Sequence, residues 1–146
     1  MACRKPADYL YGEHTADILI RAYGCTLDEA FKNAAIGTVE IMYDTSAVTP
    51  AKGVEVRLEH DDLEGLLFAW ISEILYLFDG EKFAIGRHMD LEVGGDGPYV
   101  LAATLRGERY DVDKHRFKGL IVKAMTYNMM KIAKNEFWEL QFVVDI

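Results

Sequence analysis

The segment from Leu63 to Phe78 constrains the fold more than any other part of this 146-residue chain. Its large apolar side chains recur at intervals of three and four residues, which is the spacing of one face of an α-helix. They are Leu63, Leu66, Leu67, Trp70, Ile71, Ile74, Leu75 and Phe78. Either Asp61 or Asp62 can cap the amino end of this helix. So heavy an apolar stripe predicts that the helix forms the centre of the hydrophobic core.

A second helix and several strands are predicted around it. Thr26, followed three residues later by Glu29, has the pattern of a capping box and opens a helix that is predicted to run to about Met42. Alternation of apolar and polar side chains with a period of two predicts strands. The predicted strands cover residues 17–23, 54–59, 83–85, 89–93, 99–106, 120–127 and 137–144. This order predicts one α+β domain over residues 1–146, with a mainly antiparallel or mixed sheet and the two principal helices packed on one of its faces.

The amino terminus is predicted to be a flexible tail over residues 1–8. The chain has two cysteines, Cys3 and Cys25, which are too few for a disulfide framework, and both are expected to be free thiols. The first residues lack the apolar region of a signal peptide. The longest strongly apolar stretch, residues 66–78, is interrupted by polar residues and is too short to cross a membrane. These features predict a cytoplasmic protein.

The net charge of the chain restricts the kinds of molecule that it is expected to bind. The formal net charge is −8 at pH 7. A protein that binds nucleic acid through the phosphates is expected to be basic, so strong direct binding of nucleic acid is not expected here. An acidic chain can still work beside RNA through a protein partner, and it can also bind divalent cations.

Acidic residues near both ends of the chain suggest a metal site. Asp17 stands directly before the apolar run Ile18–Ile20, although an unpaired buried charge is costly. Asp145 is followed directly by Ile146, so a main-chain carboxyl group is expected beside it. If the first and last strands are neighbours, these three carboxyl groups converge and repel one another unless a cation neutralises them.

Oxygen ligands of this kind suit a hard ion such as Ca²⁺ or Mg²⁺. His14, three residues before Asp17, could join the site or orient it. The alternative interpretation is that Asp17 caps a turn, that Asp145 is a solvated strand end, and that the two never meet.

The second candidate is a basic loop, defined here as residues 111–119. Its basic side chains belong to Lys114, His115, Arg116 and Lys118. Such a group could bind a phosphate, a nucleotide or an acidic partner surface. It could equally be an ordinary solvated loop. His115 by itself does not indicate general base catalysis, because no nucleophile pattern accompanies it.

Common catalytic motifs are missing from the sequence. It contains no Walker A motif, no G-x-G-x-x-G opening a helix, no C-x-x-C, no H-E-x-x-H and no G-x-S-x-G. The methionine-rich stretch 124–134 is predicted to pack in the core rather than to bind peptides. Residue patterns alone therefore lead to an acidic α+β domain with a possible metal site built from oxygen ligands.

Four motifs, in order along the chain, resemble the archease family. They are "HTADI" followed by "AYGCTLDEAFKNAA", then "DDLEGLLFAWISEILYLFD", then "DKH" followed by "IVKAMTYNMM", and finally "VVDI". The likeness extends over nearly the whole chain. One departure is Asn128, which stands where many members have a histidine after "TY", so any contribution of that histidine is in question here.

The resemblance implies an accessory protein rather than an enzyme. Archeases assist the RtcB-type tRNA-splicing ligase, which joins RNA ends after it has taken a guanylate from GTP onto an active-site histidine in the presence of divalent metals. The accessory protein promotes this guanylylation, permits multiple turnover and broadens the nucleotides accepted. Its association with tRNA is expected to be indirect.

The resemblance also assigns roles to residues. It implies a metal site at Asp17, Asp145 and the carboxyl group of Ile146, with Ca²⁺ favoured over Mg²⁺. It places the functional lysine of the basic loop at Lys114, and we expect Lys114 and His115 to contact a partner or a phosphate.

Two other functions are compatible with the same residues. One is a small metal-dependent phosphoesterase with Asp17 and Asp145 as ligands and His14 or His115 as the acid/base. The other is a general chaperone or an RNA-binding module. The acidic charge and the lack of a stripe of aromatic and basic residues weigh against RNA binding.

Overall fold

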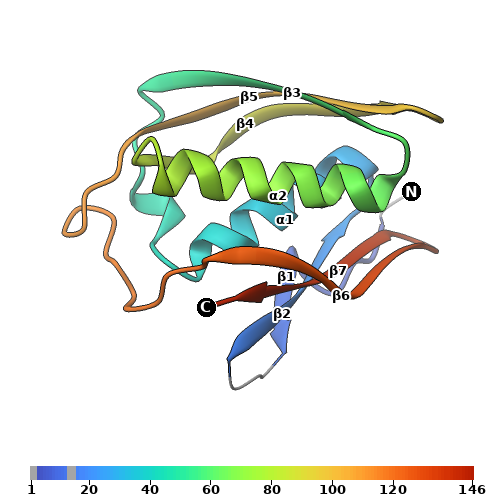
Figure 1. Ribbon diagram of the computed structural model, residues 1–146, viewed down its shortest axis with the longest axis horizontal. Coiled ribbons are helices and arrows are strands. Elements are labelled where there is room, and N and C mark those ends of the chain that lie inside the picture. Colours follow the sequence, from blue (N-terminus) through green and yellow to red (C-terminus); the bar gives the residue numbers. More distant parts are fainter. Residues whose placement is uncertain (1–2, 13–15) are drawn as a thin grey trace.

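The computed structural model describes residues 3–12 and 16–146. The chain forms two antiparallel sheets with two helices between them (Figure 1). The predicted α+β class with two principal helices is therefore confirmed. One detail differs from the prediction, because the strands divide into two sheets and the helices pack against both of them.

The larger sheet holds four strands in the order β1-β2-β7-β6. Their bounds are Tyr9–Gly12 for β1, Asp17–Gly24 for β2, Trp138–Asp145 for β7 and Ala124–Lys134 for β6. The smaller sheet holds three strands in the order β3-β5-β4. Their bounds are Lys52–His60 for β3, Tyr99–Arg109 for β5 and Phe83–Gly95 for β4.

The helices are α1 (Leu27–Glu40) and α2 (Leu63–Asp79), and a short 3₁₀ helix, η1 (Thr45–Ala47), follows α1. Thr26 caps α1 by accepting a hydrogen bond of 3.1 Å from the Glu29 N–H, as the capping pattern predicts. Asp62 caps α2 in the same way. Among the described residues, no helix is long and apolar enough to cross a membrane.

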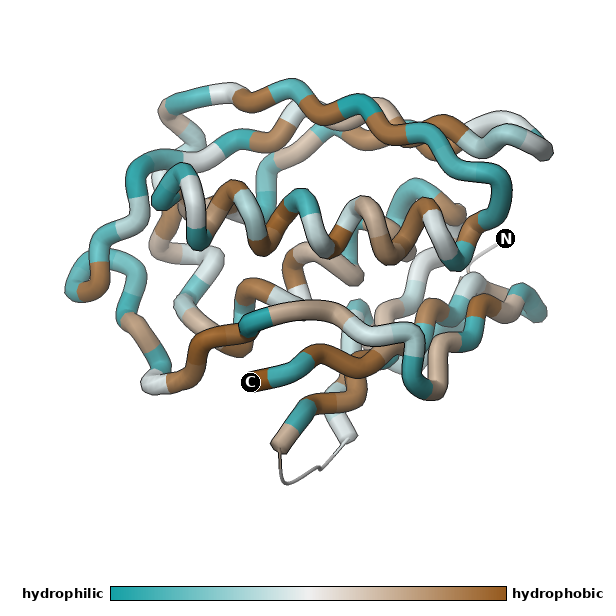
Figure 2. Tube along the Cα trace, viewed as in Figure 1, coloured by the Kyte–Doolittle hydropathy of each residue, from teal (hydrophilic) through white to brown (hydrophobic). Residues whose placement is uncertain are grey.

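The hydrophobic core lies in the helix layer and the sheet faces that enclose it. Helix α1 contacts β2 of one sheet and β4 of the other, while α2 contacts β6 and β3. Apolar positions recur along both helices and the strands around them (Figure 2). Trp70 of α2 is fully buried and donates a hydrogen bond of 2.9 Å from Nε1 to the carbonyl oxygen of Phe31 in α1. The stripe found in the sequence is thus the centre of the core.

Two strands differ from their predicted bounds because their register shifts. The segments 83–85 and 89–93 belong to the single strand β4, whose pairing with β5 shifts between Ile85 and Met89. Strand β6 begins at Ala124 rather than at residue 120, and its pairing with β7 shifts between Thr126 and Lys131. An irregular register interrupts the period of two, which is the only strand signal that the sequence offers.

The prediction of two free thiols is wrong, whereas the flexibility of residues 1–8 stays a prediction. Cys3 and Cys25 form a disulfide with a Cα–Cα distance of 5.7 Å. Lys5 forms ion pairs of 2.9 Å with Asp8 and with Glu29 of α1. Residues 3–8 therefore lie against the start of α1, an arrangement that depends on the tertiary fold and leaves no local pattern in the sequence.

Candidate functional site

Asp17 and Asp145 lie directly opposite each other in the structure. They are a register pair of the antiparallel ladder between β2 and β7. Residues directly opposite in such a ladder project from the same face of the sheet, with Cβ atoms about 5 Å apart. Asp17 is half-buried and Asp145 is exposed. The juxtaposition predicted from the two ends of the sequence is confirmed, whereas metal binding by these residues stays a prediction.

The alternation of the two strands explains why a carboxylate stands beside an apolar run. Ile20 of β2 and its register partner Phe142 of β7 are fully buried in the core beneath the helices. Side chains at odd positions of both strands, including Asp17 and Asp145, project from the opposite face. The two acids thus avoid the core while the residues next to them enter it.

The carboxyl end of β7 is held between its neighbours. On one side Lys123, just before β6, donates a hydrogen bond of 2.8 Å from its N–H to the carbonyl oxygen of Asp145. On the other side the Ile146 N–H lies 3.5 Å from the carbonyl oxygen of Ala16, just before β2. The Ile146 side chain packs against the core. These contacts fix the main chain of residues 145 and 146 at the sheet end where Asp17 lies.

The candidate ligands for a cation at this position are oxygen atoms. The described residues contain no group of three or more His, Cys, Asp or Glu side chains that could hold a metal ion. Two aspartates therefore need a further ligand of another kind, such as a main-chain carboxyl group, water or an oxygen of a partner. His14, the predicted accessory residue, lies outside the described residues. Carboxylate and water oxygens suit Ca²⁺ or Mg²⁺.

Two side chains of the basic loop, those of Lys114 and His115, contact Glu108 of the same chain. Lys114 Nζ lies 2.9 Å from Glu108 Oε1 and 2.6 Å from Oε2, and it donates a further hydrogen bond of 2.9 Å to Thr49 Oγ1. His115 Nε2 lies 2.8 Å from Glu108 Oε2, while its Nδ1 accepts the Asp111 N–H at 2.9 Å. The His115 side chain is 0% exposed. The predicted contact of His115 with a partner or phosphate is therefore not available in this structure.

Hydrogen bonding strongly favours the ionised form of Glu108. The hydrogen bonds from the Lys114 side chain, the Thr49 N–H and the His115 ring lower the pKa of this carboxyl group from 4.5 to about 2. Glu108 is thus a carboxylate at any pH near neutrality, and Lys114 faces a permanent negative charge.

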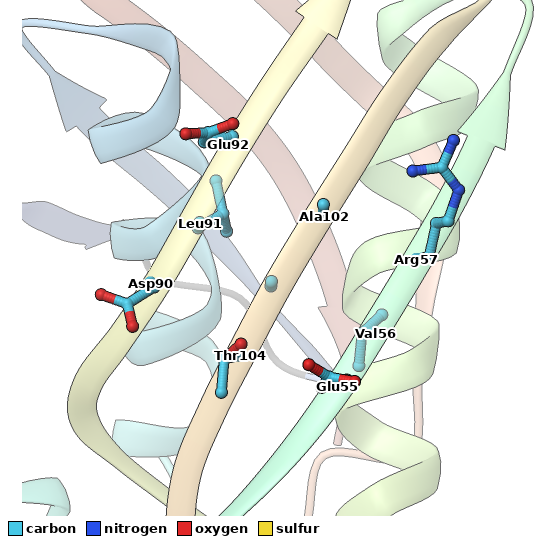
Figure 3. A pocket seen from close by; sticks show the side chains of 9 residues that line it. Glu55, Val56, Arg57, Asp90, Leu91, Glu92, Ala102 and Thr104 are labelled. Atoms are coloured by element: carbon cyan, nitrogen blue, oxygen red, sulfur yellow. The ribbon is translucent and has the colours of Figure 1, made fainter.

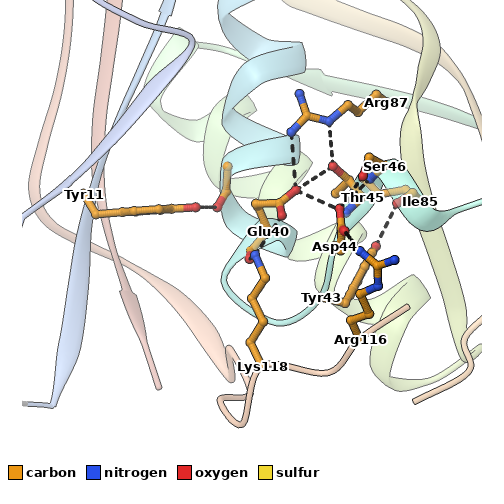
Figure 4. A network of polar contacts seen from close by, with 11 residues as sticks. Tyr11, Glu40, Tyr43, Asp44, Thr45, Ser46, Ile85, Arg87, Arg116 and Lys118 are labelled. Carbon is orange, nitrogen blue, oxygen red and sulfur yellow. Dashed lines mark hydrogen bonds and ion pairs between the residues drawn. The ribbon is translucent and has the colours of Figure 1, made fainter. Parts of the chain in front are cut away.

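The other basic side chains of the loop are also paired. Arg116 lies 3.1 Å from Asp44, and Lys118 lies 2.8 Å from Glu40 at the end of α1 (Figure 4). Each basic side chain of the loop therefore has an acidic partner in the same chain. The three acids were missed in the sequence because they lie far from the loop or, for Glu108, on a strand with no distinctive motif.

A groove on the other sheet lies apart from these residues. It has a volume of about 360 Å³ and lies along the outer face of β3, β5 and β4 (Figure 3). Its polar walls are formed by Glu55 and Arg57 on one side and by Asp90 and Glu92 on the other. The groove does not belong to the Asp17–Asp145 site, which lies on the four-stranded sheet.

The chain matches one known protein family over nearly its whole length. The family described as "Archease protein family (MTH1598/TM1083)" matches residues 9–146. The chain belongs to the archease family.

Similar proteins support this membership over the whole length. The protein archease of Pyrobaculum neutrophilum is 60% identical over 147 aligned positions that cover 100% of both chains. The protein archease of Aeropyrum pernix is 43% identical over 141 positions, covering 94% of this chain and 96% of its own. The solution structure of Methanobacterium thermoautotrophicum protein 1598 superimposes with a TM-score of 0.81 at 30% identity, covering 95% of this archease and 99% of that chain.

Proposed function

We propose that this archease is an accessory protein of an RtcB-type tRNA-splicing RNA ligase in the cytoplasm. It promotes guanylylation of the active-site histidine of the ligase, permits multiple turnover and broadens the use of nucleotides. The observation that supports this proposal most strongly, beside family membership, is the register pair of Asp17 and Asp145 at one end of the larger sheet. Two carboxylates held face to face are a natural ligand pair for a divalent cation.

In this proposal Asp17, Asp145 and the carboxyl group of Ile146 bind one divalent cation, Ca²⁺ in preference to Mg²⁺. Ca²⁺ accepts six to eight oxygen ligands in flexible geometry, whereas Mg²⁺ demands near-ideal octahedral coordination. The preference for Ca²⁺ follows from family membership, because two carboxylates completed by water would suit Mg²⁺ equally well. The cation either fixes the edge that enters the ligase near its active site or meets the phosphates of the nucleotide, where it neutralises charge during transfer.

Lys114 supplies a second contact, either with a phosphate or with a carboxylate of the ligase. Its side chain is 45% exposed, so a partner can reach it. Association with tRNA is indirect, because the net charge is −8 and the basic side chains of the loop are already paired with acids.

The test is guanylylation of the ligase histidine with and without this archease. We expect Asp17→Ala and Asp145→Ala to lose stimulation while the proteins stay folded. Asp96→Ala is the matched control, since Asp96 is exposed in the turn between β4 and β5 on the other sheet. Full stimulation by both site variants would exclude the proposal.

A second variant tests the main-chain carboxyl group. One glycine added after Ile146 moves that carboxyl group away from Asp17 and Asp145 but leaves both aspartates in place. We expect the extended protein to need more Ca²⁺ for half-maximal stimulation. An unchanged requirement would remove Ile146 from the ligand set.

The phosphoesterase alternative has lost one of its two acid/base candidates, because His115 is fully buried and both of its ring nitrogens have hydrogen-bond partners. Turnover of phosphate esters by the isolated protein with Mg²⁺ or Mn²⁺ would nevertheless support an enzyme. We expect no turnover in the absence of the ligase.

A further inference from the structure

We infer that Glu108 is a positioning residue, which holds the Lys114 ammonium group in a fixed direction for its partner. The inference rests on the proposed function, in which Lys114 contacts an anionic oxygen of the ligase or of its nucleotide. Glu108 lies near the end of β5, the central strand of the three-stranded sheet. Its main chain is therefore anchored on a rigid element.

The Glu108 carboxylate is itself fixed by donors other than Lys114. The Thr49 N–H, which precedes β3, donates to Oε2 at 3.0 Å. His115 Nε2 lies 2.8 Å from the same oxygen. Because these two donors come from different segments of the chain, the carboxylate is held even when Lys114 moves.

The buried ring of His115 fixes the direction of the second donor. Its Nδ1 accepts the Asp111 N–H, so the proton of the neutral ring lies on Nε2 and points to Glu108. The ring packs against two aromatic rings that also contact each other, with centroids 6.1 Å from Tyr43 and 5.7 Å from Tyr110. His115 therefore orients Glu108, and Glu108 in turn orients Lys114.

The number of donors on Lys114 shows what this arrangement leaves for a partner. A lysine ammonium group has three N–H donors and rotates freely on a flexible stem. Here Glu108 and Thr49 Oγ1 accept from it, which uses two directions. Because the side chain is 45% exposed, we infer that the third donor can meet a carboxylate or phosphate oxygen of a partner. Preorganisation of this kind reduces the entropy that is lost when a partner binds.

Chemical labelling of lysines distinguishes the positioning role of Glu108 from a purely structural role. Glu108→Gln keeps an oxygen acceptor for His115 and Thr49 but removes the charge that holds Lys114. We expect an amine-acylating reagent, with mass spectrometry of the products, to modify Lys114 about threefold faster in this variant, the factor that corresponds to a partly exposed ion pair. Arg116→Asn is the matched control: it breaks the neighbouring ion pair of the same loop, and asparagine tolerates the positive φ of 59° at that position.

The same variants are then tested in ligase guanylylation at saturating archease. We expect Glu108→Gln to lower the maximal rate about tenfold through misplacement of Lys114, and the control Asp96→Ala to leave it unchanged. Thr49→Val removes only the second acceptor of Lys114. It should also speed the labelling of Lys114 and slow guanylylation, but by smaller factors than Glu108→Gln. If Glu108→Gln does not fold, Thr49→Val is the variant that tests the positioning of Lys114.

The outcomes separate this inference from the proposed function. Unchanged labelling of Lys114 in folded Glu108→Gln would overturn the positioning role. Faster labelling with unchanged guanylylation would also overturn it, provided that Lys114→Ala abolishes stimulation. If Lys114→Ala stimulates fully, the proposed contact of Lys114 fails, while the labelling still reports whether Glu108 holds this side chain.

Discussion

At the scale of single residues, Asp17 and Asp145 illustrate how strand register can concentrate charge. Like charges that face each other across an antiparallel ladder destabilise it. We therefore expect this pair to favour a bound cation, which would neutralise both charges. The stability of the protein is expected to respond to divalent ions, and to respond less when one of the two carboxylates is removed.

A change at Asp145 tests this expectation without the ligase. In the presence of a chelator, we expect Asp145→Asn to raise the free energy of unfolding by roughly 0.2–1 kcal/mol, because it removes the repulsion between opposed carboxylates. Denaturant unfolding measures this, with Asp96→Asn on the exposed turn as the control. Destabilisation by Asp145→Asn under these conditions would mean that the carboxylate makes a favourable contact even without a cation.

The lowered pKa of Glu108 predicts that the stability of the protein depends on pH. The pKa of Glu108 is lowered on folding from 4.5 to about 2, so its contribution to stability is complete above about pH 4.5 and is lost as the pH falls through 2. As the pH falls over this interval, we expect the free energy of unfolding to decrease less in Glu108→Gln than in the unmodified protein. The difference should be on the order of 1 kcal/mol after allowance for solvent screening. Urea unfolding at a series of pH values provides the measurement. Identical pH profiles for the two proteins would contradict the assignment.

At the scale of elements, the helices were predicted well and the bounds of the strands less well. The capping pattern at Thr26 and the apolar stripe from Leu63 to Phe78 are local, and both helices begin at the predicted caps. Pairing of strands is non-local, and the shifts of register in β4 and β6 interrupt the alternation. The acid pair was predictable because Asp17 begins and Asp145 closes a segment of alternating apolar residues. Glu108 has no such pattern around it.

The amino-terminal segment and α1 form a unit whose stability depends on the disulfide. Cys3 and Cys25 are 22 residues apart, and closing a loop of this length stabilises the folded state by up to about 3 kcal/mol in the chain-entropy model. We expect Cys3→Ser to lower the free energy of unfolding by up to that amount. A reducing agent should have the same effect on the unmodified protein and none on the variant. Equal stability of the oxidised and reduced proteins would show that the ion pairs of Lys5 hold the segment by themselves.

At the scale of the whole molecule, the two helices form a shared layer on which both sheets depend. Trp70 connects α2 to α1 through its hydrogen bond to Phe31 and is fully buried. This explains why the apolar stripe of α2 is so heavy: it has to cover parts of two sheets as well as the neighbouring helix. The sequence indicated the weight of the stripe, but it could not show that the strands divide into two sheets.

A substitution at Trp70 tests the shared layer. We expect Trp70→Phe to lower the free energy of unfolding by about 2–3 kcal/mol, through a cavity and a lost buried hydrogen bond. Trp138→Phe, at the half-buried start of β7, should cost less than about 1 kcal/mol. Calorimetry should show a single transition for both variants. Separate melting of the two sheets in Trp70→Phe would contradict a common core.

We propose that the paired acids at one end of the larger sheet bind a divalent cation, and the whole account of function depends on this ion. Calorimetric titration of the isolated protein with Ca²⁺, compared with Asp17→Asn and Asp145→Asn, tests it most directly. We predict one cation per chain for the unmodified protein, with binding lost or strongly weakened in both variants. Equal binding by all three proteins, or no binding by any of them, would exclude a cation site at Asp17 and Asp145.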